Sequence, residues 1–510
     1  MRSPFLTRLA ALAQAGPGAR PAIEDDHGVR TFSALYEGAL RARDILCPRN
    51  TTGATSLAGR RVVILLSPGA AWIEAFAGVL LAGGVAVPLS PLYPAAELGW
   101  FAADADADTV IVGEEHDDRA GLLREGRRLL RPADLRAASA DAEPAEVDAG
   151  DTALLLYTSG TTGKPKGAMI THENVFVQAS LLHAAWGYRE DDRLLHALPL
   201  HHLHGLGISL LTSLLAGACS RMLPRFDARR VWEELARGGV SVWMAVPTMY
   251  QKLIEAFDAA DEATQARWSA GARALRLATS GSAALPVTLA ARWKEIAGAV
   301  PLERFGMTEI GVGMSNPLEV GGRRPGSVGP ALPTVEARIV DDAGQDLDRG
   351  PGELLIRGPS VFSGYFRREE ATRSAFTEGW FKTGDVAERG PDGYVRLLGR
   401  TSVDILKSGG YKLSALEIEE VLREHAAVAE VAVIGLPDET WGDRVVAVVV
   451  AAPGRAAECA PDVLRAWAKE RLATYKVPRD VIVARALPRN ALGKVVKPEL
   501  IRAVASGEIV

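Results

Sequence analysis

The ten residues TSGTTGKPKG, from Thr158 to Gly167, decide how this sequence is interpreted. They combine three glycines, two lysines and four hydroxyl side chains, directly after the apolar run Leu154 to Tyr157. Flexible backbone N–H groups, hydroxyls and cations are the groups that hold a polyphosphate. The spacing is not that of a Walker A loop. The stretch therefore predicts a phosphate-binding loop between a strand and a helix that begins near Thr171.

Length, composition and charge restrict the number of domains, the partners and the compartment that we expect for this chain. With 510 residues, 48% of them hydrophobic and 24% charged, the chain is expected to form two or more globular domains. A formal net charge of -5 provides no general attraction for nucleic acid or anionic lipid. Three widely spaced cysteines fit a reducing compartment, and we expect a cytoplasmic protein.

Two apolar segments could be mistaken for targeting or membrane elements. The first sixteen residues weakly resemble a targeting peptide, but an amphipathic first helix is the interpretation that we favour. The stretch Ile73 to Leu89 contains glycine, glutamate and proline, so it predicts a buried helix followed by a strand and no membrane span.

The pattern of apolar runs predicts an α/β fold. Strand-like runs such as Val62 to Leu66 alternate with helical patterns such as Ala71 to Leu81, which favours parallel sheets covered by helices. From about Val335, short strands and turns indicate a small β-rich subdomain. We expect residues 1–399 to form a large N-terminal domain and residues 400–510 a small, mobile α+β C-terminal domain.

Five segments together resemble the adenylate-forming superfamily, which includes acyl-CoA synthetases, luciferases and nonribosomal adenylation domains. They are TSGTTGKPKG at 158–167, RFGMTE at 304–309, GWFKTGD at 379–385, GRTSVDILKSGGYK at 399–412 and PRNALGK at 488–494. The resemblance covers nearly the whole chain. It implies an enzyme that uses ATP and Mg2+ to form an acyl-adenylate and then transfers the acyl group to coenzyme A.

The resemblance also implies which residues bind the nucleotide. Ser280 to Ser282 and Phe305 match segments that flank adenine, Asp385 matches the carboxylate that binds the ribose hydroxyls, and Arg400 matches a cation near ribose or phosphate. The full implied set for ATP and AMP is Thr158, Ser159, Gly160, Thr161, Thr162, Gly163, Lys164, Lys166, Ser280, Gly281, Ser282, Arg304, Phe305, Gly306, Met307, Asp385 and Arg400.

Catalytic roles follow from the same resemblance. Thr308 is expected to contact the α-phosphate, Glu309 to hold Mg2+, and Lys494 to bridge the carboxylate and the α-phosphate. A hinge is expected near Ser402, where many members carry Asp or Lys. Rotation about this hinge replaces Lys494 with the coenzyme A loop, formed by Ser408, Gly409 and Gly410.

The acyl pocket is expected around His202, and several stretches resemble the malonyl-CoA synthetase branch. A dicarboxylate leaves one carboxylate unreacted, which requires a buried cation or several donors. Lys252 and then Arg276 are our candidates for that cation. Malonate is therefore the favoured small-molecule substrate, with methylmalonate as a second candidate. A medium-chain or aryl acyl-CoA synthetase, or an enzyme that loads a separate carrier protein, remains an alternative.

Overall fold

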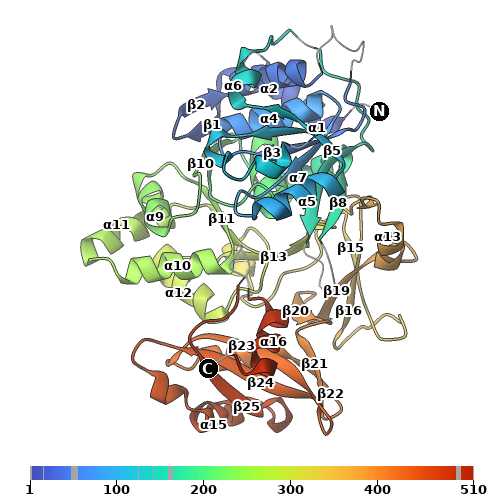
Figure 1. Ribbon diagram of the computed structural model, residues 1–510. Coiled ribbons are helices and arrows are strands. Elements are labelled where there is room, and N and C mark those ends of the chain that lie inside the picture. Colours follow the sequence, from blue (N-terminus) through green and yellow to red (C-terminus); the bar gives the residue numbers. More distant parts are fainter. Residues whose placement is uncertain are drawn as a thin grey trace.

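The molecule divides into an N-terminal body and a smaller C-terminal body that lies below it in Figure 1. The computed structural model describes residues 3–14, 16–47, 56–124, 126–141, 143–158, 165–489 and 495–508. Ser159 to Lys164 and Lys494, which we expected in the site, lie outside the described residues.

A seven-stranded sheet carries the phosphate-loop segment. Its order is β17 (Gly364–Tyr365), β8 (Lys166–Thr171), β7 (Thr152–Thr158), β4 (Val85–Pro88), β3 (Arg61–Leu65), β5 (Ala107–Val112) and β6 (Arg128–Leu130). The strands from β7 to β6 are parallel, whereas β8 and β17 are antiparallel additions at one edge. The alternation of strands and helices in the sequence predicted this parallel core.

A second, eight-stranded sheet carries the other half of the site. Its order is β14 (Gly311–Ser315), β13 (Leu302–Met307), β12 (Leu277–Ser280), β11 (Val242–Ala245), β9 (Arg193–His196), β10 (Cys219–Met222), β1 (Pro21–Asp25) and β2 (Gly28–Thr31). The strands from β13 to β1 are parallel, and the hairpins β13–β14 and β1–β2 close the two edges.

A small antiparallel sheet completes the N-terminal body, as the change of sequence texture near Val335 predicts. It contains β15 (Glu336–Val340), β16 (Gly352–Arg357), β18 (Phe376–Thr377), β19 (Trp380–Arg389) and β20 (Val395–Arg400). Strand β20 ends at the point where we placed the boundary between the two domains.

The C-terminal body has its own sheet of β22 (Tyr411–Ser414), β21 (Ile405–Ser408), β24 (Gly442–Ala451), β23 (Val428–Asp438) and β25 (Asp480–Ala484). Helices α14 (Ala415–Arg423), α15 (Pro461–Arg471) and α16 (Lys497–Ser506) pack around it. Its two hydrophobic clusters draw their side chains from residues 406–504 alone. The boundary at 399/400 stays a prediction, and this independent core is consistent with it.

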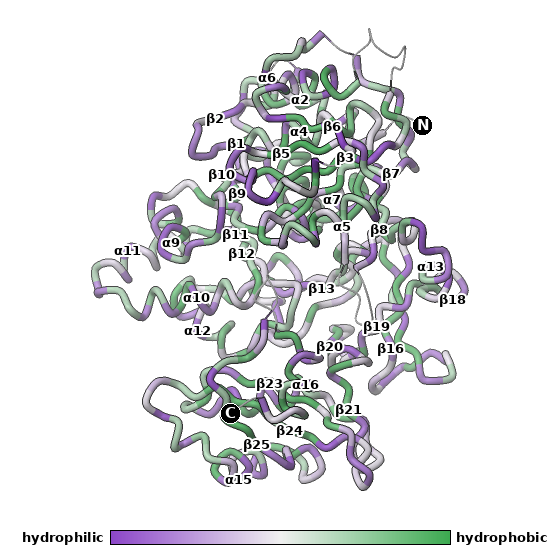
Figure 2. The backbone as a smooth tube through the Cα atoms, in the orientation of Figure 1, coloured by the Kyte–Doolittle hydropathy of each residue, from purple (hydrophilic) through white to green (hydrophobic). Residues whose placement is uncertain are grey.

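Helices cover both large sheets. They are α1 (Pro4–Ala13), α2 (Phe32–Leu46), α4 (Ala70–Leu81), α5 (Ala95–Asp104), α6 (Pro132–Ala137), α7 (His172–Ala185), the π-helix η4 (His204–Leu211), α8 (Thr212–Leu215), α9 (Ala228–Arg237), α10 (Pro247–Asp258), α11 (Glu262–Arg273), α12 (Val287–Ala297) and α13 (Glu369–Ala375). Figure 2 shows hydrophobic colour along the central strands and α4, with hydrophilic colour on the outer turns. Among the described residues, no helix is both long and apolar enough to cross a bilayer.

The surroundings of the phosphate loop differ from our expectation in one respect. A helix does begin close to Thr171, at His172, but strand β8 stands between the loop and that helix. At the two ends of the loop, Tyr157 pairs with Gly167 and Thr158 pairs with Lys166 in antiparallel strands. A helix N-terminus consequently does not follow the loop directly.

The close packing of the β13–β14 hairpin generates a test of the fold. A Cβ atom on Gly306 would lie 2.2 Å from the carbonyl oxygen of Gly311, whereas one on Gly313 would have its nearest neighbour at 3.5 Å. We expect Gly306→Ala to lower the free energy of unfolding by about 2–3 kcal/mol, because the hairpin backbone must open, and Gly313→Ala to change it by less than about 0.5 kcal/mol. Thermal and urea unfolding of the two variants measures this, and equal stabilities would contradict it.

Candidate active site

Lys166 and Glu309 approach each other through Tyr365. Lys166 is the first residue of β8, and its Nζ lies 5.1 Å from the centre of the Tyr365 ring. The Tyr365 hydroxyl donates a hydrogen bond of 2.9 Å to Oε1 of Glu309, which is buried just after β13. Burial and the nearby Glu309 carboxylate raise the pKa of Tyr365, so its hydroxyl stays a donor. Tyr365 itself was missed at the sequence level, although an aromatic residue after Gly364 was a visible signal.

Asp385 and Arg400 are direct partners. They face each other in the β19–β20 pairing, and Nε of Arg400 lies 2.9 Å from Oδ1 of Asp385. Nη1 of Arg400 also donates to the carbonyl of Thr383 at 3.1 Å. The Arg400 charge acts to lower the pKa of Tyr365, so Arg400 lies within electrostatic reach of the tyrosine that bonds to Glu309. Four of the expected residues, Lys166, Glu309, Asp385 and Arg400, therefore form one region.

A second group of polar residues gathers at the carboxyl ends of β12 and β13. Ser280 ends β12, and Ser282 follows with a φ of +69°, a left-handed value that is uncommon outside glycine. The Oγ of Ser282 lies 3.1 Å from Nδ1 of His204, the first residue of η4. A strained backbone residue and a π-helix in contact are typical of functional regions.

Arg304 lies against this group, and it is a buried guanidinium without a carboxylate partner among the described residues. It is 4% exposed, and its Nε and Nη2 have no hydrogen-bond partner among the described residues. Burial alone lowers the pKa of Arg304 to about 9, so the side chain is still a cation at neutral pH. Gly281 makes room for it, because a Cβ there would lie 2.4 Å from Cζ of Arg304. Nε2 of His204 and Oγ of Ser280 are likewise buried without a partner in the described chain.

The remaining residues from the RFGMTE segment line the same strand and turn. Phe305 is buried, and Gly306, Met307 and Thr308 are partly exposed. Thr308 borders a small cavity that is also lined by Gly207 of η4 and by Gln178. The amide oxygen of Gln178 accepts a hydrogen bond of 2.9 Å from the backbone of Val312, which holds the β13–β14 hairpin beside α7.

The histidines at 201–204 are neutral, with His204 buried and His201 and His202 half-buried. Burial lowers the pKa of His202 to about 4 and lowers those of His201 and His204 well below their usual value. The His201 and His202 rings lie 4.1 Å apart between their centres. Neutral imidazole rings can donate or accept hydrogen bonds, but they carry no positive charge. A cation that balances an acyl-pocket carboxylate must therefore come from another residue.

The two cations that we expected near the acyl group have different positions. Lys252 lies in the second turn of α10 and is exposed. Arg276 precedes β12, at the opposite end of that strand from Ser280. Its guanidinium pairs with Asp192, with Nε 3.0 Å from Oδ1, and donates to the carbonyl of Trp186 at 2.9 Å. Arg276 is therefore engaged in an ion pair that joins structural elements and is not brought together with Arg304 and His204.

The expected coenzyme A loop forms the turn of the β21–β22 hairpin. Gly409 and Gly410 have φ values of +58° and +83°, and the amide of Gly409 donates to the carbonyl of Trp441 at 2.9 Å. Exposed aromatic side chains lie beside this turn. The rings of Tyr411 and Tyr475 are stacked at 4.3 Å, and the guanidinium of Arg479 lies 3.7 Å from the Trp441 ring centre.

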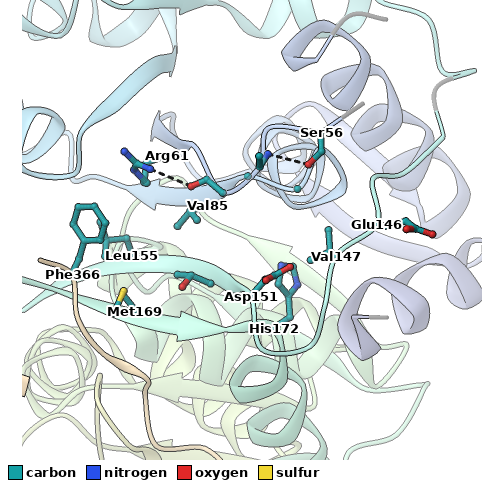
Figure 3. Close-up of a pocket in the computed structure, with 15 residues that line it drawn as sticks. Ser56, Arg61, Val85, Glu146, Val147, Asp151, Leu155, Met169, His172 and Phe366 are labelled. Atoms are coloured by element: carbon teal, nitrogen blue, oxygen red, sulfur yellow. Dashed lines mark hydrogen bonds between the residues drawn. The ribbon is translucent and has the colours of Figure 1, made fainter. Parts of the chain in front are cut away.

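A cavity of about 330 Å³ lies elsewhere, between the β3–β4 region and the β7–β8 hairpin (Figure 3). Arg61, Asp151, His172 and Phe366 are among the residues that line it. None of the described residues that we expected in the ATP, acyl or coenzyme A sites borders this cavity. The region assembled above, and not this cavity, is therefore our candidate active site.

Known proteins are similar to this chain over nearly its full length. The family model for AMP-binding enzyme matches residues 10–366, and that for the AMP-binding enzyme C-terminal domain matches residues 417–494. Malonate–CoA ligase ACSF3, mitochondrial, of Homo sapiens is 40% identical over 538 residues, covering 98% of this chain and 92% of the relative. Malonate–CoA ligase of Arabidopsis thaliana is 39% identical, covering 96% of this chain and 87% of the relative.

A solved structure shares the arrangement of the two bodies. ATP-bound MatB from Rhodopseudomonas palustris is 34% identical, with 99% of each chain covered and a TM-score of 0.89. The apo form of the same protein gives a TM-score of 0.80. The arrangement described here is thus more similar to the ATP-bound form.

The buried histidines generate a prediction for pH. Burial lowers the pKa of His196 to about 4 from 6.5, so between these values the unfolded chain binds a proton that the folded chain does not. Stability should therefore fall as the pH falls from 6.5 to 4, by up to about 3 kcal/mol for this residue. Glu303 acts in the opposite direction, because burial raises its pKa to about 8 and its contribution is lost as pH rises through that value.

Comparison of matched variants isolates the histidine effect. His196→Gln keeps a donor toward the carbonyl of Gly205, which His196 Nε2 contacts at 2.9 Å, and should show a shallower loss of stability below pH 6.5 than the wild type. His27→Gln, at an exposed position, is the control and should keep the wild-type pH dependence. Denaturant unfolding from pH 8 to pH 4.5 measures both, and identical slopes for all three proteins would refute this account.

Proposed function

The chain belongs to the AMP-binding enzyme family, and from that premise we propose that it is a malonate–CoA ligase. It uses ATP, Mg2+ and coenzyme A. One malonate carboxylate attacks the α-phosphate of ATP, the bond to the β-phosphate breaks, and pyrophosphate leaves. The thiolate of coenzyme A then attacks the carbonyl carbon of malonyl-adenylate, and AMP leaves as malonyl-CoA forms.

The observation that carries the choice of a dicarboxylate is the buried, unpartnered Arg304. A buried cation is stable only when an anion or several acceptors face it, and none of the described residues supplies one. We expected Arg304 to contribute to nucleotide binding, and its surroundings lead us to a different assignment. We assign Arg304 to the malonate carboxylate that does not react, with the free Nε2 of His204 as a second contact.

The nucleotide side is assigned to the region around Tyr365. Glu309 would hold Mg2+ through its carboxylate, which Tyr365 already orients, and Lys166 would neutralise phosphate charge beside it. Asp385 would accept hydrogen bonds from the ribose hydroxyls, with Arg400 holding its carboxylate in place. Thr308 and Lys494 would contact the α-phosphate, and Ser280 to Ser282 with Phe305 to Met307 would border the nucleotide and the acyl group.

We assign coenzyme A to the turn at Ser408 to Gly410. Residues without side chains at 409 and 410 let a thin pantetheine arm pass, and the neighbouring turn is closed by Trp441. The stacked pair Tyr411 and Tyr475, together with Arg479 over the Trp441 ring, offers aromatic and cationic groups for the nucleotide end of coenzyme A.

An enzyme for an alkyl or aryl carboxylic acid would share the ATP motifs and differ in its acyl pocket. An alkyl or aryl carboxylic acid, and equally an enzyme that loads such an acid onto a carrier protein, would leave the Arg304 guanidinium buried beside an apolar group. This cost favours the dicarboxylate. For the compartment we propose the cytoplasm, because the three cysteines are buried and form no disulfide bond with one another. The human relative carries the word mitochondrial in its name, so the activity itself does not require the cytoplasm.

A panel of acids tests the proposed function directly. We expect ATP-dependent pyrophosphate release to be fastest, by kcat/KM, with malonate and next with methylmalonate. Acetate, octanoate and benzoate should be slower by roughly 10²-fold or more, because they leave the buried cation without its anion. A clear preference for any monocarboxylate would overturn the assignment of malonate.

Substitution of Arg304 tests the residue that carries the proposal. Arg304→Met should lower kcat/KM for malonate by roughly 10²- to 10⁴-fold, since the lost partner is a buried charge. It should raise the rate with 3-methylbutyrate, in which an isopropyl group replaces the second carboxylate. Lys294→Met, at an exposed position on α12, is the control and should stay within about twofold of the wild type. An unchanged ratio of malonate to 3-methylbutyrate activity in Arg304→Met would contradict the role of Arg304.

A further inference from the structure

A buried ion triad lies inside the C-terminal body. The ammonium of Lys497 lies 2.6 Å from Oδ1 of Asp404 and 2.7 Å from Oε1 of Glu419. All three side chains are buried, at 9%, 13% and 8% exposure respectively. Burial acts to lower the pKa of Lys497, but the carboxylates of Glu419 and Asp404 outweigh it and raise that pKa above its usual value. Lys497 is thus a buried cation at neutral pH, held between two carboxyl groups.

One end of the triad anchors the segment that contains Lys494. Lys497 is the first residue of α16 and stands three positions after Lys494. The base of that segment is closed, because Arg489 pairs with Val495 and the amide of Val496 donates to the carbonyl of Pro488 at 2.9 Å. In Figure 1, α16 lies at the upper edge of the C-terminal body, the edge turned toward the N-terminal body. The Lys497 side chain therefore fixes the point where the segment enters α16.

The other end of the triad lies at the expected hinge. Oδ2 of Asp404 accepts a hydrogen bond of 3.0 Å from the amide of Arg400, and the amide of Asp404 donates to the carbonyl of Arg400 at 2.8 Å. Ser402 lies inside the turn that these bonds close. The carboxylate of Asp404 thus contacts Arg400 on one side of Ser402 and Lys497 on the other. Arg400 in turn pairs with Asp385.

Glu419 extends the connection into the rest of the C-terminal body. It lies on α14, and its Oε1 also accepts a hydrogen bond of 2.8 Å from the amide of Val433 on β23. The ammonium of Lys497 therefore joins α16, the hinge turn, α14 and β23. Among these contacts, the one between Lys497 and Asp404 connects the start of α16 with Arg400, which pairs with Asp385 of the proposed ribose site.

We propose that Lys497 is a positioning residue for the adenylation half-reaction. Through Asp404 it fixes the start of α16, three residues after Lys494 in the chain, relative to the Arg400 turn, and this anchor serves the reaction in which Lys494 acts on the α-phosphate while Asp385 and Arg400 hold the ribose. Lys497 touches no substrate and transfers no proton. This inference rests on the proposed function, because it acts through Lys494. Displacement of a catalytic group by about 1 Å can reduce a rate by about 10²-fold, which sets the scale of the effect.

The experiment compares the two half-reactions in single variants. In Lys497→Met, we expect kcat for malonate-dependent ATP–pyrophosphate exchange to fall by about 10- to 100-fold, with the KM values for ATP and malonate within about threefold. Thioester formation from supplied malonyl-adenylate should stay within about threefold, because Lys494 serves only adenylation. Lys497→Arg should recover at least about a third of the exchange rate. Equal loss in both half-reactions, or no loss in either, would overturn the proposal.

A matched control separates positioning from general stability. Lys476 forms a partly buried ion pair of 2.7 Å with Glu417. Glu417 lies on α14, as Glu419 of the triad does, but the Lys476–Glu417 pair does not include Asp404. Lys476→Met should keep exchange within about twofold even where its thermal stability falls as much as that of Lys497→Met. If Lys497→Met does not fold, Asp404→Asn tests the same contact while Lys497 retains Glu419. A similar loss of exchange in Lys476→Met and in the triad variant would count against the proposal.

A double variant tests whether Lys497 acts through Lys494. Adding Lys497→Met to Lys494→Ala should reduce the remaining exchange by less than about twofold, since the group being positioned is already absent. A further tenfold reduction would overturn the inference. If the wild type catalysed exchange with no acid in the panel, the proposed function and this inference would both fail. A wild type that is active beside an equally active Lys497→Met would overturn this inference alone.

Discussion

The hydrogen bond between Tyr365 and Glu309 joins the two large sheets at the site. Tyr365 belongs to β17, at the edge of the seven-stranded sheet, and Glu309 follows β13 of the eight-stranded sheet. Neighbouring bonds support it, since the amide of Phe362 donates to the carbonyl of Glu309 at 2.8 Å and Oγ of Ser360 donates to that of Ile310 at 2.9 Å. The short segment 360–365 therefore sets the distance between the β7–β8 strand pair and the turn that contains Thr308. Through Tyr365, this segment holds Lys166 of one sheet near Glu309 of the other.

Much of the fold was predictable because local pattern and tertiary environment agree. The apolar runs at Val62 to Leu66 and Ala71 to Leu81 became β3 and α4, both buried, as their periodicities indicated. Strand β8 was missed because its six residues begin with a lysine and a glycine, and its β-branched residues are only the last two, Ile170 and Thr171. Its existence depends on pairing with β7 and β17, which are contacts that a local pattern does not contain.

The charged residues show where sequence reasoning ends. Arg276 directly precedes β12, and Arg304 is the third residue of β13, the neighbouring strand of the same sheet. Arg276 meets Asp192, 84 positions away in the chain, whereas Arg304 meets no carboxylate in the described chain. The difference between a structural ion pair and a candidate binding cation therefore lies in long-range contacts. Lys497 is a third case, because a lysine at the start of a terminal helix gives no sign of two buried carboxylate partners.

The contacts between the two bodies differ in kind from the contacts within the smaller one. Across the boundary, Lys412 pairs with Asp342 where both are exposed, and the amide of Val287 donates to Glu420 at 3.3 Å. Exposed ion pairs contribute little to stability and are weakened further by salt. The Lys497 triad, in contrast, lies wholly on the C-terminal side of Ser402. Rotation about that residue would exchange the exposed Lys412–Asp342 pair and the hydrogen bonds that join Asp404 to Arg400 and Ser414 to Leu398, whereas the triad would move as one unit with the C-terminal body.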